Sequence, residues 1–282
     1  MLPLFFGCCV IQFHIQFMAR KRSALNKLLV SRGLAASIED ASKIIAAGLV
    51  TVDSNLADKA GMEYPVDSKV EVRKTREFVG RGALKLQRAL SVFPCSPAGK
   101  ICADVGSSTG GFTQILLQAG AIKVYAIDVG YGELDWKLRE DPRVVVMERT
   151  NARNITALDD RIEFLTMDVS FISTSVLFPV IRSWLADAAD MIVLLKPQFE
   201  ALREEVEAGG IVREESVHRR VIEEAVSAAH AAGFGAQGVD TSPILGGEGN
   251  REFLVWLRLG ASIAVDLSAQ ISAALAIKPP KA

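Results

Sequence analysis

The chain has 282 residues, of which 50% are hydrophobic and 23% charged, a composition that excludes a disordered chain and allows one large domain with a second, small one. The formal net charge of −1 is unevenly distributed: residues 18–90 hold 14 Lys and Arg against 8 Asp and Glu, or +6, and the remainder holds 18 against 25, or −7. A basic N-terminal part indicates contact with a polyanion, although a chance excess of exposed lysines would give the same balance.

Residues 1–17 are apolar and contain no Lys or Arg. A secretory signal carries its positive charges ahead of the apolar segment, whereas here Arg20, Lys21 and Arg22 follow it. The segment is also too short, and too interrupted by Gln and His, to span a bilayer. We therefore expect translation to start at Met18, with residues 1–17 a doubtful extension, and no stable membrane association. The four cysteines have neither metal-site nor disulfide spacing, which indicates a cytoplasmic protein without a metal site.

Between Ala24 and Gly48 the apolar residues recur at helical spacing, which predicts two short helices. Residues 49–52 and 69–73 then alternate as strands. This small α+β layout resembles the S4-type RNA-binding module, which would occupy residues 18–78. Ile38 stands after Ser37, where such modules usually carry a basic residue, so reduced RNA affinity is expected. The resemblance implies RNA contacts from the basic residues Arg20, Lys21, Arg22, Lys27, Arg32 and Lys43.

From Lys100 onward, strands alternate with helices, which predicts an α/β fold with a mostly parallel, Rossmann-like sheet and helices on both faces. Ligands bind such sheets beyond the carboxyl ends of the strands. The domain would cover residues 79–260, followed by a C-terminal tail, 261–282. Strands are predicted near 100–106, 123–129, 143–148, 162–168, 191–197, 236–242 and 251–259, and helices near 111–119, 133–140, 174–187 and 215–232.

A glycine-rich turn, Asp104-Val-Gly-Ser-Ser-Thr-Gly-Gly-Phe112, follows the first of these strands. Its glycines miss the G-x-G-x-x-G spacing of dinucleotide sites, and Phe112 stands where a P-loop needs lysine. Asp128 closes the next strand, where a carboxylate binds the ribose of nucleoside cofactors. S-adenosylmethionine fits these features best, and a tight turn beside a solvated acid is the alternative. The predicted cofactor-binding residues are Asp104, Gly106, Ser107, Ser108, Thr109, Gly110, Gly111, Phe112 and Asp128.

Methyl transfer to a hydroxyl requires in-line positioning of the methyl group and a base that removes the hydroxyl proton. Lys85, Asp168, Lys196 and Glu252 stand at or near predicted strand ends and could supply this chemistry. Lys196 follows a wholly apolar strand, where a charged amine is costly without partners. Taken singly, each could be part of a structural ion pair. The D/N-P-P-Y/F motif of exocyclic-amine methylation is missing, since Asp168-Val-Ser-Phe171 stands there, and neither this loop nor the next contains the cysteine of carbon-5 methylation.

Several motifs resemble the TlyA (haemolysin A) family of ribosomal RNA 2′-O-methyltransferases, whose catalytic domain is similar to the FtsJ-type methyltransferases. The likeness runs from about Met18 to Arg258 and includes residues 81–86, 104–112, 124–131, 134–137, 168–171, 195–200, 242–244 and 249–253.

The resemblance implies a class I S-adenosylmethionine-dependent methyltransferase sheet and a Lys-Asp-Lys-Glu tetrad at Lys85, Asp168, Lys196 and Glu252. It also implies a cytidine 2′-hydroxyl of 16S or 23S ribosomal RNA, or of both, as the substrate, ribosomal subunits as partners, and an RNA contact from Arg81. Gly80-Arg-Gly-Ala83 replaces the usual Ser-Arg-Gly-Gly, which reduces backbone freedom near Lys85. The competing hypotheses are a non-catalytic RNA-binding ribosome-assembly factor and, ranked last, a membrane-active haemolysin.

Overall fold

The computed structural model describes residues 21–73, 77–263 and 266–278. The chain divides between Glu77 and Phe78 into two compact units. Arg20 and the doubtful extension 1–17 lie outside the described residues. Within the described ranges, no helix has the length and apolarity needed to cross a bilayer.

The N-terminal unit is a small α+β fold around its own apolar core. Its two predicted helices are present, and Ser37 caps the second by accepting a hydrogen bond from the Asp40 backbone N–H at 3.1 Å. The core is formed by Leu25, Leu29, Ala41, Ile45, Val50, Val52, Ala57 and Val70. Two sheets, β1-β4 and β3-β2-β5, complete the unit. Its elements are β1 (Arg22–Ala24), α1 (Leu25–Ser31), α2 (Ile38–Ala46), β2 (Val50–Val52), β3 (Asn55–Leu56), β4 (Glu63–Pro65) and β5 (Val70–Val72).

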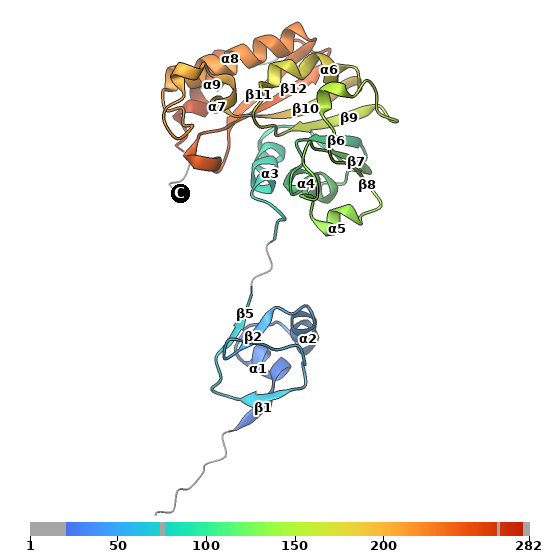
Figure 1. The fold of residues 1–282 in the computed structure, drawn as a ribbon, viewed down its shortest axis with the longest axis vertical. Coiled ribbons are helices and arrows are strands. Elements are labelled where there is room, and N and C mark those ends of the chain that lie inside the picture. The colour runs from blue at the N-terminus through green and yellow to red at the C-terminus, as the bar shows by residue number, and fades with distance from the viewer. Residues whose placement is uncertain (1–20, 74–76, 264–265, 279–282) are drawn as a thin grey trace, which may run out of the picture. The chain divides into compact units, whose positions relative to one another are not determined.

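The second unit contains one seven-stranded sheet in the order β11-β12-β10-β9-β6-β7-β8 (Figure 1). The strands β8, β7, β6, β9 and β10 pair in parallel, and β12 pairs antiparallel with both β10 and β11. The mostly parallel α/β sheet predicted from the sequence is therefore confirmed. Its strands are β6 (Ile101–Val105), β7 (Lys123–Ile127), β8 (Val144–Met147), β9 (Ile162–Met167), β10 (Leu185–Leu195), β11 (Phe234–Thr241) and β12 (Phe253–Leu259).

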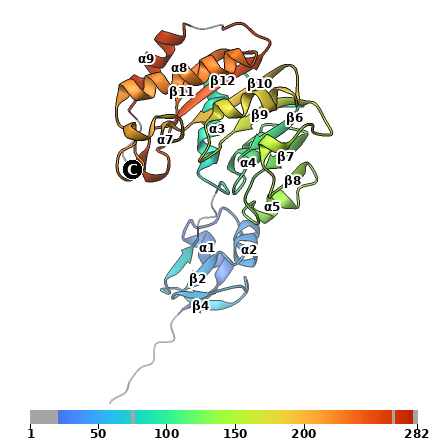
Figure 2. The same ribbon diagram turned by 45° about the horizontal axis from the view of Figure 1, so that its top comes forward.

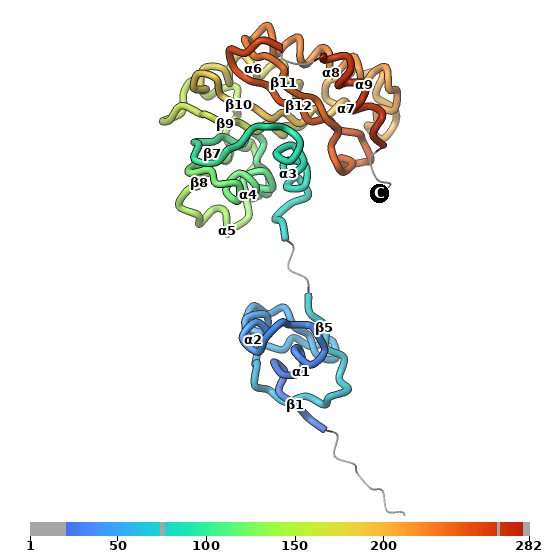
Figure 3. The backbone as a smooth tube through the Cα atoms, turned by 180° about the vertical axis from the view of Figure 1, so that it is seen from behind, coloured from blue at the N-terminus to red at the C-terminus, as the bar shows by residue number. Residues whose placement is uncertain are grey.

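Helices cover both faces of this sheet, because alternate strand residues point to opposite sides. In β10, Met191, Val193 and Leu195 belong to one core, which also receives side chains from α6 (Phe178–Arg182), α8 (Glu215–Ala231) and α9 (Leu267–Ala276). Figure 2 shows α8 and α9 beside the strands β11 and β12. Ile192 and Leu194 belong to the other core, beneath α3 (Gly82–Val92) and α4 (Gly111–Gln118), which Figure 3 shows from behind.

Two segments depart from the predicted elements. Residues 174–187 form the 3-10 turn η2 (Thr174–Val176), the short helix α6, which ends at Arg182, and the start of β10, where Leu185 already pairs with Ile162 of β9. The helix predicted over 133–140 shortens to α5 (Trp136–Arg139), whose N-cap is Asp135. The preceding residues form a loop that contributes to the site.

Three helices, α3, α7 (Pro197–Glu200) and α9, were not predicted. The tail expected over 261–282 contains α9, whose Ile271, Ala274 and Leu275 are buried against the sheet. Their helical spacing was present in the sequence. Arg251 fastens the end of this helix, because its Nη2 donates to the carbonyl oxygens of Ala274, Leu275 and Ile277 at 3.2, 3.0 and 2.8 Å.

Candidate active site

Four ionisable side chains form two ion pairs at the carboxyl edge of the parallel strands. The Nζ of Lys85, in α3, lies 2.5 Å from Oε2 of Glu252, and these side chains are 10% and 2% exposed. The Nζ of Lys196, which follows β10, lies 2.6 Å from Oδ1 of Asp168, which follows β9. Because β12 runs antiparallel, Glu252 at its start lies at this same edge. The sequence had predicted the four residues but not their pairing.

The two ion pairs influence each other. Burial raises the pKa of Glu252, Lys85 opposes this shift, and the charges of Asp168 and Lys196 add smaller effects of opposite sign. The Glu252 carboxylate is covered by a loop that requires glycine, since a Cβ at Gly246 would lie 2.3 Å from its Oε1. The site therefore holds two lysines and two carboxyl groups in a shielded environment.

Lys196 has a second partner that the sequence analysis did not predict. Its Nζ donates to the Ser170 hydroxyl at 2.9 Å, in addition to its contact with Asp168. An ammonium group carries three donors and a neutral amine two donors and a lone pair, so these two contacts leave one position of the nitrogen for a substrate atom. Ser170 and Asp168 both line the cavity described next.

A cavity of about 460 Å³ opens where β6, β7, β8 and β9 end. This volume is in the range of small-molecule sites, about 300–1,000 Å³. Its walls combine apolar side chains with a few polar groups, the usual composition of such sites. The lining residues include Gly106, Ser108, Ile127, Asp128, Val129, Asn151, Ala152, Asp168, Ser170 and Phe171.

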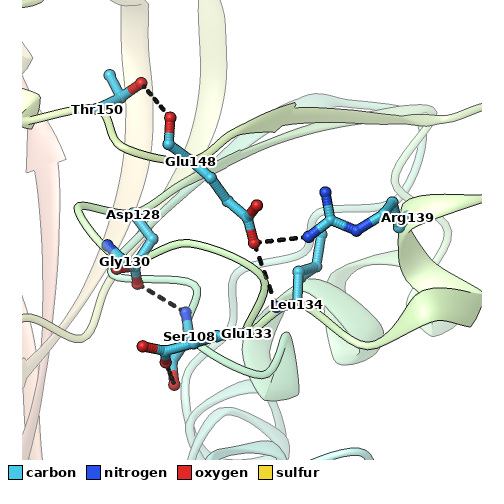
Figure 4. A network of polar contacts seen from close by, with 8 residues as sticks. All are labelled: Ser108, Asp128, Gly130, Glu133, Leu134, Arg139, Glu148 and Thr150. Carbon is cyan, nitrogen blue, oxygen red and sulfur yellow. Dashed lines mark hydrogen bonds and ion pairs between the residues drawn. The ribbon is translucent and has the colours of Figure 1, made fainter.

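Asp128 organises the wall of the cavity beyond β7 (Figure 4). Its Oδ2 accepts the Ser108 backbone N–H at 2.8 Å and its Oδ1 accepts that of Gly130 at 2.7 Å. The Ser108 hydroxyl donates to Glu133 at 3.1 Å, so the glycine-rich turn and the loop after β7 are joined. A carboxylate offers about four acceptor sites, and Asp128 therefore keeps capacity for a ligand.

The glycines of the turn serve close packing. A Cβ at Gly106, whose φ is 86°, would lie 2.2 Å from the Asp168 carbonyl oxygen, so this position packs the turn against the loop that follows β9. A Cβ at Gly110 would lie 2.2 Å from Leu138, and one at Gly111 2.9 Å from the Ala83 backbone nitrogen. The turn is consequently pressed between α5, α3 and the end of β9.

Several residues predicted to bind cofactor lie away from the cavity. Asp104 is fully buried and accepts hydrogen bonds from the Thr113 and Thr166 hydroxyls at 2.7 and 2.9 Å. Burial raises its pKa to about 7. Ser107 and Phe112 are buried as well. The Thr109 hydroxyl packs against Gly80, since a Cβ at Gly80 would lie 2.4 Å from it. Among the residues predicted to bind cofactor, the cavity is lined by Gly106, Ser108 and Asp128.

An exposed aromatic residue stands beside the tetrad and was missed by the sequence analysis. Phe171 is 90% exposed, has a positive φ of 63° and packs on Phe199 at 4.9 Å between ring centroids. The sequence offered only a phenylalanine after a strand, which usually indicates a core residue.

The basic residues predicted to bind RNA have different surroundings. Lys21, Lys27 and Arg81 are exposed. Arg22 donates to the Glu63 carbonyl oxygen, and Arg32 donates to those of Ser68 and Val66, so these guanidinium groups brace the N-terminal unit. Lys43 pairs with Glu39 at 2.9 Å on the surface of α2.

Comparisons with known proteins identify the family of this chain. The 16S/23S rRNA (cytidine-2′-O)-methyltransferase TlyA of Mycobacterium tuberculosis is 41% identical over 84% of this chain and 90% of its own length. Hemolysin A of Brachyspira hyodysenteriae is 39% identical over 82% and 97%. A solved structure of a hemolysin-named protein from Streptococcus thermophilus is 39% identical, covers 92% of this chain and 96% of its own, and has a TM-score of 0.69. Residues 78–259 match the model of the FtsJ-like methyltransferases, and the chain therefore belongs to that family.

Proposed function

We propose that this protein transfers a methyl group from S-adenosylmethionine to a ribose 2′-hydroxyl of ribosomal RNA, with cytidine as the modified nucleoside. The observation that carries the proposal is the pair of lysine–carboxylate contacts, Lys85–Glu252 and Lys196–Asp168, beside a cavity at the ends of β6, β7, β8 and β9. Support for the substrate class comes from the relative named as a 16S/23S rRNA (cytidine-2′-O)-methyltransferase. Such a substrate implies a cytoplasmic enzyme.

The cavity fits a nucleoside cofactor. Asp128 faces it with two backbone contacts and unused acceptor capacity for a ribose diol, and Gly106 brings the backbone close without a side chain. Ile127, Val129 and Ala152 offer apolar surface for the base. When bound, S-adenosylmethionine supplies an electrophilic methyl group.

The chain's own residues hold the hydroxyl and take its proton. Asp168 and Ser170 fix the direction of the Lys196 nitrogen. In its neutral form Lys196 would accept the 2′-hydroxyl proton while the oxygen takes the methyl group; the carbon–sulfur bond of the bound sulfonium would break in the same step and leave a neutral thioether. Lys85, held by Glu252, contributes a positive charge beside the reacting oxygen or an adjacent phosphate.

Phe171 provides a surface for a nucleobase. A phenylalanine that is 90% exposed beside a catalytic site offers a flat apolar face, and proteins that modify or read RNA stack unpaired bases on such rings. We propose that the N-terminal unit is an S4-type RNA-binding module, in which the exposed Lys21 and Lys27 contact phosphates.

The test is methyl transfer from labelled S-adenosylmethionine to purified small and large ribosomal subunits and to naked ribosomal RNA. Incorporation at an alkali-resistant site that is lost in Lys196→Ala, with cofactor binding retained, is the expected result. Cofactor binding without incorporation on any of these RNAs would contradict the proposal and favour a non-catalytic assembly factor.

A further inference from the structure

We propose that Glu200 is a positioning residue for methyl transfer. It holds the loop that runs from the end of β9 into η2 (residues 168–174) against the segment 196–200, which begins with Lys196. This inference rests on the proposed function. It concerns a residue that touches neither the cavity nor the four ionisable groups of the tetrad.

The segment 196–200 contacts this loop at three successive places. Lys196 contacts Asp168 and Ser170 at the beginning of the loop. Phe199, within α7 (Pro197–Glu200), packs on Phe171 in its middle. Glu200, at the end of the helix, contacts the last two residues of the loop.

Glu200 uses both carboxylate oxygens. Its Oε2 accepts the Ser173 hydroxyl at 2.6 Å and its Oε1 accepts the Thr174 backbone N–H at 2.8 Å. Ser173 is the N-cap of η2, and Thr174 is only 2% exposed. Hydrogen bonds to a charged acceptor are stronger than neutral ones, so Glu200 fixes the point where the loop rejoins the fold.

The loop needs such an anchor because it is strained. Phe171 adopts a φ of 63°, a conformation that costs a bulky residue free energy and persists only where surrounding contacts impose it. The start of the loop is fixed by the Asp168 backbone N–H, which donates to the Val105 carbonyl oxygen at 2.9 Å. Without the Glu200 contacts, the segment 169–173 can relax, and Ser170 then leaves Lys196.

The experiment compares Glu200→Ala and Glu200→Gln in the full-length protein, with the exposed Glu204 of η3 (Arg203–Glu205) changed to Ala as the matched control. Glutamine can keep both contacts by accepting from Thr174 and donating to the Ser173 oxygen. We expect Glu200→Ala to lower kcat by about 10- to 100-fold, the effect of misplacing reacting groups by about 1 Å. Glu200→Gln and Glu204→Ala should stay near the wild-type rate.

Wild-type kcat in Glu200→Ala, or equal loss in Glu200→Ala and Glu200→Gln, would overturn the inference. Ser173→Ala, which removes one of the two contacts, gives a milder variant if Glu200→Ala fails to fold, and unaltered kcat in that variant would overturn it as well. An inactive wild-type protein would instead overturn the proposed function and this inference with it.

Discussion

The Nζ of Lys85 and the Glu252 carboxylate lie 2.5 Å apart, and each is almost completely removed from solvent. Removing one partner of such a pair leaves a buried charge unmatched, at a cost of about 3–5 kcal/mol. We therefore expect Glu252→Ala to lower the free energy of unfolding by that amount, measured by urea denaturation. The double variant Lys85→Met with Glu252→Leu should recover most of it while remaining inactive in methyl transfer. Equal stability of the single variant and the wild type would contradict a buried, charged pair.

Asp104 should make the protein less stable as the pH rises. Its pKa is raised by burial from 3.8 to about 7, so between these values the folded protein binds more protons than the unfolded chain. Stability attributable to this group therefore falls from about pH 4 to pH 7 and stays low above it. Asp104→Asn cannot ionise, and its free energy of unfolding relative to wild type should increase by more than about 1 kcal/mol between pH 4.5 and 7.5. Asp187→Asn, at an exposed position, is the control, and a similar change there would argue against the assignment.

Gly106 packs the glycine-rich turn against the loop that follows β9, so Gly106→Ala should disturb both segments. The added Cβ would meet the Asp168 carbonyl oxygen at 2.2 Å, and we expect a loss of stability greater than about 2 kcal/mol together with weaker cofactor binding. Gly132 has a similar positive φ of 73° but open space around it, so Gly132→Ala should cost only about 1 kcal/mol. Thermal unfolding and calorimetric titration with S-adenosylmethionine measure both effects. Matching losses in the two variants would show that the backbone conformation alone matters.

Phe171 should affect RNA methylation more than stability. Its ring is exposed, so Phe171→Ala removes little buried surface, whereas the loss of a stacked base is worth about 1–3 kcal/mol. We expect kcat/KM for RNA to fall about tenfold or more and Phe171→Tyr to retain activity. Full activity of the alanine variant would rule out a stacking role.

Pattern and spacing predicted the strands of the sheet well, because parallel strands buried on both faces are nearly continuous apolar runs. The same reasoning correctly placed Asp168, Lys196 and Glu252 at strand ends, but Lys85 lies within α3. It could not assign Lys85 to Glu252 and Lys196 to Asp168, since those pairings depend on the order of the strands in space. The sequence predicted that Asp104 binds the cofactor. An aspartate that faces a ligand at the end of a strand and an aspartate buried below the ligand site have the same place in the sequence pattern.

Other omissions have local causes. Leu267, Ile271, Ala274 and Leu275 of α9 do follow helical spacing, but the segment stands after the last predicted strand, where we expect a C-terminal tail. The role of Glu200 was not visible, because its contacts reach Ser173 and Thr174 from a different element. The exposure of Phe171 results from a loop conformation that the sequence pattern does not predict.

The tetrad matches two lysines to two carboxyl groups and so carries no net positive charge. It therefore adds little to the attraction of a polyanion, which must come from cations elsewhere on the protein. Salt screens exposed charges far more than contacts of 2.5 and 2.6 Å inside the fold. Ionic strength should therefore change the rate at which RNA binds and leave the rate of methyl transfer in the enzyme–RNA complex largely unchanged. Binding of the substrate and chemistry on it thus depend on different charges of the protein.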